Sequence, residues 1–446
     1  MLENHSALFL PDHSFVYSIS DAAIVGQTLS GEQVAGVNDI APIVNIFLQF
    51  AFGVSAGFCV ITSCNVGSHN QPGVRRSLAT QIVLSAVLTL LLTALALALL
   101  NPMLAWINVT PDSGAVYTAA FTYCAIIFAG IGAQLFYNFI CSFLRAMGDS
   151  VTPLMFLLFS TVLNVGLDLL FILSFGWGVA GAAIATVAGQ ALTAGLSIWY
   201  LTRMKQIHLQ KDSFRPRAHL LGKCAKLGMT SFLAQISLVA AMAATNTMLR
   251  ICSAQDAVFS QEEFSAIPMA VFGIVMKVFQ IVISCAIGLA AGCIPVAGYN
   301  MGAGRHDRVK GLLTRLLAAE AVVGLIALLV VELLPDQVML LFGAQNESIH
   351  YTLFARRCFR VYLSMIVLAC INKGTFIFLQ SLGKAAASTL LSMAREIVFG
   401  VGLVLLLPQF FQLDGVMYSM PAADVLTAIL SAVVLVRTYR SLETEK

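Results

Sequence analysis

The chain of 446 residues is 59% hydrophobic and only 11% charged, whereas about a quarter of the residues of a soluble globular protein are charged. A water-soluble domain of this size needs charged side chains to cover its surface, so the composition excludes that class. The mean hydropathy of +0.88 and repeated apolar runs of about 20 residues are typical of a polytopic helical membrane protein. The net charge of +3 is too small to say anything about a nucleic acid or other acidic partner.

Apolar segments bounded by polar or Gly/Pro-rich breaks predict eleven membrane-spanning helices. In chain order they cover 38–66, 78–101, 114–142, 153–175, 178–201, 227–250, 268–297, 311–334, 349–379, 387–408 and 414–436. A twelfth, weaker span is predicted over 2–27, whose first half carries Pro11, Asp12 and His13. The expected fold class is therefore all-α, a membrane protein of twelve transmembrane helices.

Neither a signal peptide nor a cysteine framework is expected. The stretch from Met1 to Ser14 lacks the basic start and the apolar run of a cleavable signal. The ten cysteines are scattered through apolar segments without a CxxC pair. This pattern predicts reduced core residues, with no disulfide or zinc framework.

Basic residues divide the loops into two groups when twelve spans are assumed, and cytoplasmic loops retain Lys and Arg. The loops of one group contain none; those of the other contain Arg75, Arg76, Arg145, the basic residues from Arg203 to Lys226, Arg305, Arg308, Lys310, Lys384, Arg437, Arg440 and Lys446. We therefore expect both termini in the cytoplasm. The whole chain is expected in the cell membrane, the inner or plasma membrane.

Two short motifs recur at one separation. Asn65-Val66-Gly67 returns as Asn300-Met301-Gly302, and Phe143-Leu144-x-x-x-Gly148 returns as Phe378-Leu379-x-x-x-Gly383, each 235 residues later. The shared offset predicts a duplication into two pseudo-symmetric six-helix lobes of the same orientation. The predicted parts are an N-terminal lobe with a cation site at 1–201, a cytoplasmic linker at 202–226, a C-terminal lobe at 227–436 and a cytoplasmic tail at 437–446.

Ionisable side chains at mid-membrane depth are functional candidates by default, since burying them in lipid is costly. Asp168 lies well inside the predicted helix 153–175, and Asn164 stands one turn before it, so both share one helical face. An acid and an amide oxygen one turn apart suit a hard cation or a proton. Asp21, in the second half of the weak first span, is predicted to titrate or to bind a cation.

The second half carries more charged residues within or beside its spans: Lys277, Glu320, Glu332, Arg356, Arg357, Arg360, Lys373, Arg395, Glu396 and Asp424. Most of them are expected to extend toward the membrane surface or to form structural ion pairs, with Arg395 and Glu396 pairing locally or with a neighbouring helix. Lys277 and Asp424 lie mid-span and are candidates for either structure or function.

Aromatic residues are interleaved with these helices and could line a cleft for flat organic cations. Each one alone is more often a packing residue. They are Tyr17, Tyr123, Phe136, Tyr137, Phe139, Phe272 and Phe279. The Gly302-Ala303-Gly304-Arg305 stretch lacks the GK[ST] ending of a Walker A loop, so no ATP-driven motor is expected. No HExxH motif is present, and we expect no enzyme activity.

The combined motifs resemble the multidrug and toxic compound extrusion (MATE) transporters, prokaryotic type, over nearly the whole chain from Tyr17 onward. In the first half the motifs are Phe143-Leu144-Arg145-Ala146-Met147-Gly148-Asp149, Thr152-Pro153, Asn164 with Asp168, and Gly178 to Thr186. In the second half they are Pro295, Gly298 to Ala303, Leu382-Gly383-Lys384, Arg395, Asp414-Gly415-Val416 and Asp424. The chain departs from the family pattern at its polar start, MLENHSALFLPDHS. Here the spacing between Pro11 and Asp21 differs from that between the corresponding proline and aspartate of the family.

The resemblance implies one cation site, in the N-terminal lobe. Its residues would be Asp21, Asn164, Asp168 and Thr186, with Na⁺ as one candidate ion, and its neighbours Tyr17, Tyr123 and Ala182. Thr186 and the two tyrosines come from the resemblance alone.

The resemblance further implies a secondary antiporter that exports small organic compounds, cationic or amphipathic, in exchange for Na⁺ or H⁺ by rocking of its two lobes. No cofactor is expected; the expected partners are these small substrates and the lipid bilayer, without ATP or nucleic acid. Three alternatives stay open: a flippase for lipid-linked saccharides, an intramembrane transferase of polyprenyl groups, and a transport-dead homologue with a degenerate first helix.

Overall fold

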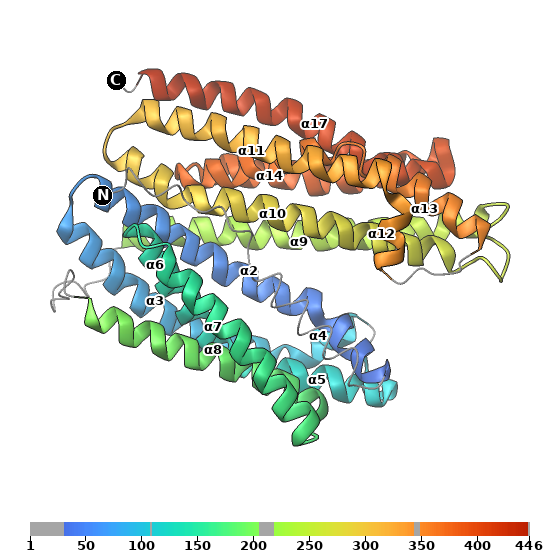
Figure 1. Cartoon of the computed structure of the whole chain (residues 1–446), viewed down its shortest axis with the longest axis horizontal. Coiled ribbons are helices and arrows are strands. Elements are labelled where there is room, and N and C mark those ends of the chain that lie inside the picture. The colour runs from blue at the N-terminus through green and yellow to red at the C-terminus, as the bar shows by residue number, and fades with distance from the viewer. Residues whose placement is uncertain (1–30, 108, 205–217, 343–347, 445–446) are drawn as a thin grey trace. The chain divides into compact units, whose positions relative to one another are not determined.

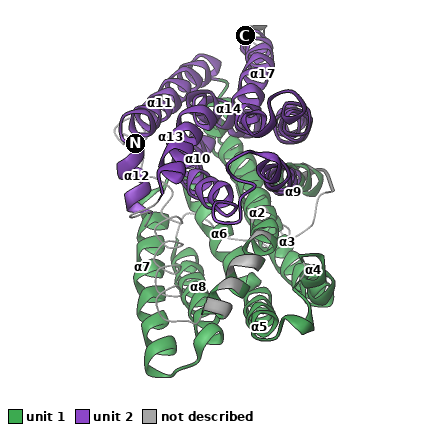
Figure 2. Cartoon of the chain, turned by 90° about the vertical axis from the view of Figure 1, so that its right-hand side faces the viewer, with its two compact units in different colours: residues 1–8, 13–232, 298–304 green, residues 9–12, 233–297, 305–446 purple. Residues whose placement is uncertain are grey.

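The structure is a computed structural model that describes residues 31–107, 109–204, 218–342 and 348–444, and every regular element in these ranges is a helix (Figure 1). The chain divides into two compact units (Figure 2). Unit 1 runs to Phe232 and includes Gly298–Gly304, and unit 2 contains Leu233–Ala297 and Arg305–Lys446. The division into lobes at 1–201 and 227–436 stays a prediction.

Unit 1 is a helical bundle in which α2 lies against α5 and α6, while α8 packs against α5, α6 and α7. Its apolar core includes Ile40, Cys124 and Phe128, all fully buried. Its elements are α2 (Gly31–Gly67), α3 (Gln71–Ala98), α4 (Leu100–Trp106), the 3₁₀ turn η1 (Pro111–Ser113), α5 (Ala115–Ala129), α6 (Ile131–Ala146), α7 (Val151–Asp168), the π-helical η2 (Leu169–Ser174) and α8 (Gly178–Arg203).

Unit 2 has its own core, in which α14 packs against α11 and α17. The helix α9 begins in unit 1, at Ala218, and α10 ends there, at Gly302. The remaining elements of the chain are α9 (Ala218–Gln255), α10 (Ile267–Gly302), α11 (His306–Leu333), α12 (Pro335–Leu341), α13 (Ile349–Tyr362), α14 (Ile366–Ser381), α15 (Ala385–Met393), the π-helical η4 (Ala394–Val401), α16 (Gly402–Leu406) and α17 (Pro408–Thr444).

Each of the eleven confident spans corresponds to a helix or a bent helix pair. Nine helices of the described ranges are long and apolar enough to cross a membrane alone, and two bent pairs raise the number to eleven. The twelfth span, over 2–27, lies outside the described residues. The segment expected as a linker at 202–226 is partly helical, since α9 already begins at Ala218.

Bends and π-helical segments interrupt four of the predicted spans. The predicted helix 114–142 is bent by 47° between α5 and α6, and 349–379 is bent by 44° between α13 and α14. The chain becomes π-helical directly after Asp168 and again around Arg395. Single-turn π segments inside α-helices are frequent at functional sites, and both of these lie beside buried charged residues.

Many large apolar side chains remain exposed on the helices. Leu90 is 74% exposed, Val162 73% and Leu173 60%. A soluble protein rarely leaves such a surface uncovered. Contact with lipid tails accounts for this exposure, because the hydrocarbon solvates apolar groups.

Candidate functional site

The candidate cation site in unit 1 begins on α7. Asn164 and Asp168 are both fully buried, at 0% exposure. They are four residues apart, so the helical repeat brings them to one face. Since η2 follows Asp168 at once, this polar face ends where the regular helix does.

The helix α8 supplies the facing wall. A Cβ added to Gly189 would lie 3.7 Å from the Cβ of Asn164, and one added to Gly181 would lie 3.1 Å from the carbonyl oxygen of Phe171. These two glycines let the α8 backbone approach α7 and η2. Thr186 stands between them in the sequence and is buried, at 7% exposure.

The amide of Asn164 and the hydroxyl of Thr186 are buried polar groups without a hydrogen-bond partner among the described residues. A buried polar group that forms no hydrogen bond costs on the order of 1–3 kcal/mol. A cation, a proton carrier or an ordered water that these oxygens bind removes that cost. The carboxyl group of Asp168, on the same helix as Asn164, is buried as well.

The neighbours expected for this site cluster around Ile172, one turn after Asp168. Ala182 of α8 is fully buried against it, and Tyr123 of α5 and Val34 of α2 pack on the same cluster. The structure thus brings Tyr123 and Ala182 together beside the end of α7. Asp21 and Tyr17, the other two residues of the predicted site, lie outside the described residues.

A second polar cluster, the Arg395 cluster, lies inside unit 2 and consists of Arg395, Glu396, Asp424 and Lys373. The guanidinium of Arg395 donates to Asp424 Oδ1 at 2.7 Å and to Glu396 Oε1 at 2.5 Å. All three side chains are at most 5% exposed. Lys373 lies within electrostatic range of the same three groups.

Further contacts fix both ends of this cluster. Asn372 donates to the backbone carbonyl of Asp424 at 3.0 Å, and the guanidinium of Arg395 lies 5.9 Å from the ring centroid of Phe279. Asp424, a candidate for either structure or function, is therefore paired with Arg395. Arg395 pairs locally with Glu396 and also with Asp424 of α17.

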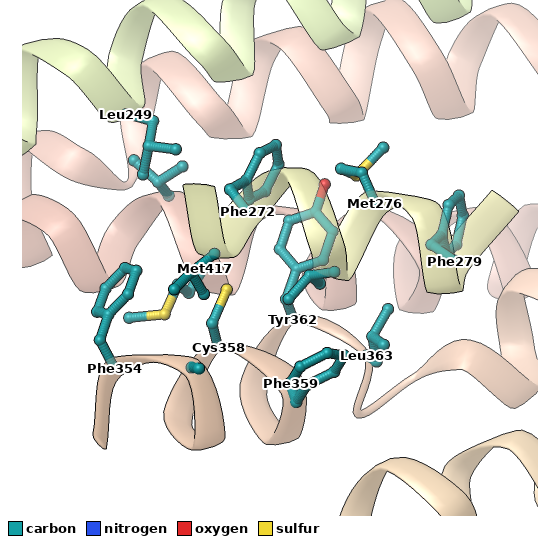
Figure 3. Close-up of a cluster of buried hydrophobic side chains, with 14 of the residues drawn as sticks. Leu249, Phe272, Met276, Phe279, Phe354, Cys358, Phe359, Tyr362, Leu363 and Met417 are labelled. Atoms are coloured by element: carbon teal, nitrogen blue, oxygen red, sulfur yellow. The ribbon is translucent and has the colours of Figure 1, made fainter. Parts of the chain in front are cut away.

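A cavity in unit 2 borders the Arg395 cluster. Its apolar wall includes Phe272, Met276, Phe279 and Tyr362, and Arg395 and Glu396 lie at its polar end. Figure 3 shows the Tyr362 ring rising from α13 between Phe272 and Met276, with the Tyr362 and Phe272 centroids 5.2 Å apart. With a volume of about 30 Å³, the cavity has room for water but not for an organic molecule.

Lys277 and Glu320 both lie inside predicted spans, but the structure exposes one and buries the other. Lys277 is exposed on α10 and is not part of the Arg395 cluster. Glu320 on α11 is 0% exposed, and neither carboxylate oxygen has a hydrogen-bond partner in the described ranges. The sequence alone assigns Glu320 no role; the signal that it offers is the place of Glu320 near the middle of the apolar run 311–334.

The arginines of α13 form exposed ion pairs. Arg356 donates to Asp336 Oδ1 at 2.7 Å, Arg357 to Asp414 at 2.5 Å, and the Arg360 side chain lies 3.5 Å from Glu332. These are the structural pairs that the sequence predicts for arginines. The hydrogen bond from Arg356 holds the pKa of Asp336, which lies on the short helix α12, below its usual value.

Comparisons with known proteins agree with this architecture. The MatE family model matches residues 14–170 and 241–406. The chain is 28% identical over 293 residues to the probable multidrug resistance protein YpnP of Bacillus subtilis (strain 168), across 66% of this chain and 62% of YpnP, which is less than two thirds of that relative's length. It is 21% identical over 439 residues to the multidrug export protein MepA of Staphylococcus haemolyticus (strain JCSC1435), across 97% and 92% of the two chains.

Solved structures share the fold. A MATE protein in the bent conformation superposes with a TM-score of 0.86 at 21% identity, covering 97% of this chain and 92% of that one. An outward-facing multidrug resistance MATE family transporter of the MOP superfamily gives a TM-score of 0.85 at 21% identity, covering 97% and 93%. At this identity the likeness concerns the fold alone.

Proposed function

Because the chain belongs to the MatE family of membrane transporters, we propose that it is a secondary antiporter that exports small organic compounds, cationic or amphipathic, in exchange for Na⁺ or H⁺. The observation that carries this proposal is the set of buried oxygen ligands on α7 and α8: Asn164, Asp168 and Thr186. The multidrug names of YpnP and MepA support the class of substrate.

The proposed mechanism is rocking of two lobes around a central site. Inward movement of one cation supplies about 2.3 kcal/mol per 100 mV of membrane potential. The cation can drive the cycle only if it binds the outward-open and inward-open states with different affinity. Asp168 is the residue proposed to make that difference, with Asn164 and Thr186 as further ligands and Asp21 from the first predicted span.

The proposed orientation has both termini in the cytoplasm, in the cell membrane. The support is the distribution of basic residues among the loops, including Arg75, Arg76 and Arg145 on one side. Two six-helix lobes, at 1–201 and 227–436, are part of the same proposal, supported by the two motifs repeated at one offset.

The ion pairs argue against a flippase for lipid-linked saccharides. A pyrophosphate group needs basic side chains whose charge is available to it. Arg356 is paired with Asp336, and Arg395 is paired with Asp424 and Glu396. These pairs leave the two arginines engaged with carboxylates of the chain itself, which favours a substrate without a pyrophosphate.

Export of ethidium from cells that lack their own efflux pumps tests the proposal. We compare the intact protein, Asp168→Asn, the control Asp112→Asn and an empty vector, at equal expression and under an imposed Na⁺ or H⁺ gradient. Asp112 is an exposed residue of the η1 turn, so its variant should export normally. We expect export by the intact protein and its loss in Asp168→Asn; export equal to the empty vector by the intact protein contradicts the proposal.

A further inference from the structure

The side chain of Glu320 lies in the contact between α11 and α14 of unit 2, two helices that run side by side (Figure 1). A Cβ added to Gly374 of α14 would lie 2.9 Å from Glu320 Cγ and 3.1 Å from Oε1. One turn further along α11, a Cβ on Gly324 would lie 2.6 Å from the Cα of Val367. The two glycines therefore bring the helix backbones together, and this close approach encloses the carboxyl group.

Among the residues that the structure describes, no compensating charge acts on Glu320. Its electrostatic partners in the described part of the chain are three thiols, those of Cys285 and Cys293 on α10 and of Cys370 on α14. The helices α12, α13 and α17 also contact α11, but within the described ranges no charged group on them acts on Glu320. Lys373, next to Gly374, interacts instead with the Arg395 cluster.

This environment selects among the possible chemical states of the carboxyl group. An isolated carboxylate is very costly in a low-dielectric interior unless it is paired and hydrogen-bonded. A metal ion such as Na⁺ or Ca²⁺ needs several hard oxygen ligands, whereas the groups that interact with Glu320 in the described ranges are thiols. A proton needs only one carboxyl oxygen, so it is the ligand that this site fits.

We propose that Glu320 is a proton-binding site in unit 2, additional to the cation site at Asp168. While α11 and α14 are packed as in this structure, the carboxyl holds its proton as a neutral acid. When the contact at Gly374 opens to water, the O–H bond breaks, the proton passes to water and the carboxylate remains. As a step in transport this inference rests on the proposed antiport function, in which Glu320 would move one proton per cycle in addition to the ion at Asp168.

The infrared absorption of the protonated carboxyl group tests this directly, without a transport assay. Purified protein in lipid nanodiscs is measured from about pH 5 to about pH 9, a range over which a perturbed carboxyl group can titrate, with and without tetraphenylphosphonium. The variants are Glu320→Gln, the control Glu332→Gln and Asp168→Asn. Glu332 lies on the same helix, but its side chain is 39% exposed and paired with Arg360.

We expect a carboxylic acid band that is missing in Glu320→Gln, is retained in the other two variants, and decreases as the pH rises or when tetraphenylphosphonium binds. A band that responds to neither pH nor tetraphenylphosphonium identifies a permanently neutral structural acid and overturns the proposal. The same holds if the intact protein and Glu320→Gln have identical spectra at every pH. If Glu320→Gln does not fold, Glu320→Asp replaces it, and the band should then shift in frequency. Failure of ethidium export alone leaves this spectroscopic result standing, so the two proposals fail separately.

Discussion

One buried polar cluster in each unit invites comparison, because the two clusters differ in how their groups are paired. In unit 2, Arg395 donates to both Asp424 and Glu396 within 2.7 Å, so the buried charges satisfy one another. In unit 1, the amide of Asn164 and the hydroxyl of Thr186 have no hydrogen-bond partner in the described ranges. The comparison separates two proposed roles: the paired groups of the Arg395 cluster are proposed to stabilise the fold, and the buried oxygens of Asn164 and Thr186 are proposed to bind an ion.

The largest effect is expected from breaking the compensated cluster. Arg395→Met leaves Asp424 and Glu396 without their shared partner, and removing one member of a buried pair costs about 3–5 kcal/mol. We expect a severe loss of folded protein, measured as the amount that stays monodisperse in size-exclusion chromatography after graded heating in detergent.

The control for this cluster is Arg357→Met, which breaks an exposed pair with Asp414. Exposed ion pairs contribute little to stability, so this variant should behave nearly as the intact protein does. Equal losses in Arg357→Met and Arg395→Met would mean that the buried cluster has no special structural role.

A smaller effect is expected from a bulky side chain placed against the buried amide of Asn164. Gly189→Leu places a branched side chain where a Cβ alone would lie 3.7 Å from Asn164 Cβ, and this should displace the amide. We expect ethidium export to fall at least about fivefold, equivalent to roughly 1 kcal/mol.

Gly195→Leu on the same helix is the matched variant. A Cβ at Gly195 meets nothing within 4 Å, so the added side chain should be tolerated and export should stay normal. If Gly189→Leu exports as well as Gly195→Leu does, the α7–α8 contact does not form the site.

The smallest effect concerns the exposed pair of Asp336 and Arg356. Because Arg356 lowers the pKa of Asp336, the pair stabilises the folded state above the unfolded pKa of about 4, and this contribution is lost as the pH falls through the folded pKa. Asp336→Asn should lower the melting temperature by less than about 2 °C at neutral pH. The difference should vanish in acid; a difference that grows on acidification would contradict this account.

The sequence predicts the spans well because a bilayer imposes their length. Runs of about 20 apolar residues are required to cross the hydrocarbon core, and each of the eleven confident runs coincides with a helix or a bent pair. The bends near Gly130 and Leu363 and the π segment around Arg395 are not predicted. They depend on tertiary packing and leave the apolar run unbroken.

The candidate site is predictable where one helix determines it. Asn164 and Asp168 share a face because of their four-residue spacing, but nothing in α8 alone distinguishes Thr186, which came from the family resemblance. Lys277 and Glu320 both lie mid-span in the sequence, yet one is exposed and the other fully buried. Which way a residue faces depends on the neighbouring helices, and one sequence does not contain that information.

The most direct test of the central claim is cation movement driven by substrate in proteoliposomes. Ethidium is added to vesicles that contain the intact protein, Asp168→Asn or Asp112→Asn, and the flux of radioactive sodium or of protons is followed in the opposite direction. The account predicts that ethidium drives the flux of one of these ions in the intact protein and in Asp112→Asn, and drives none in Asp168→Asn. Equal flux in Asp168→Asn and the intact protein would show that the buried carboxylate of unit 1 does not couple the ion to transport.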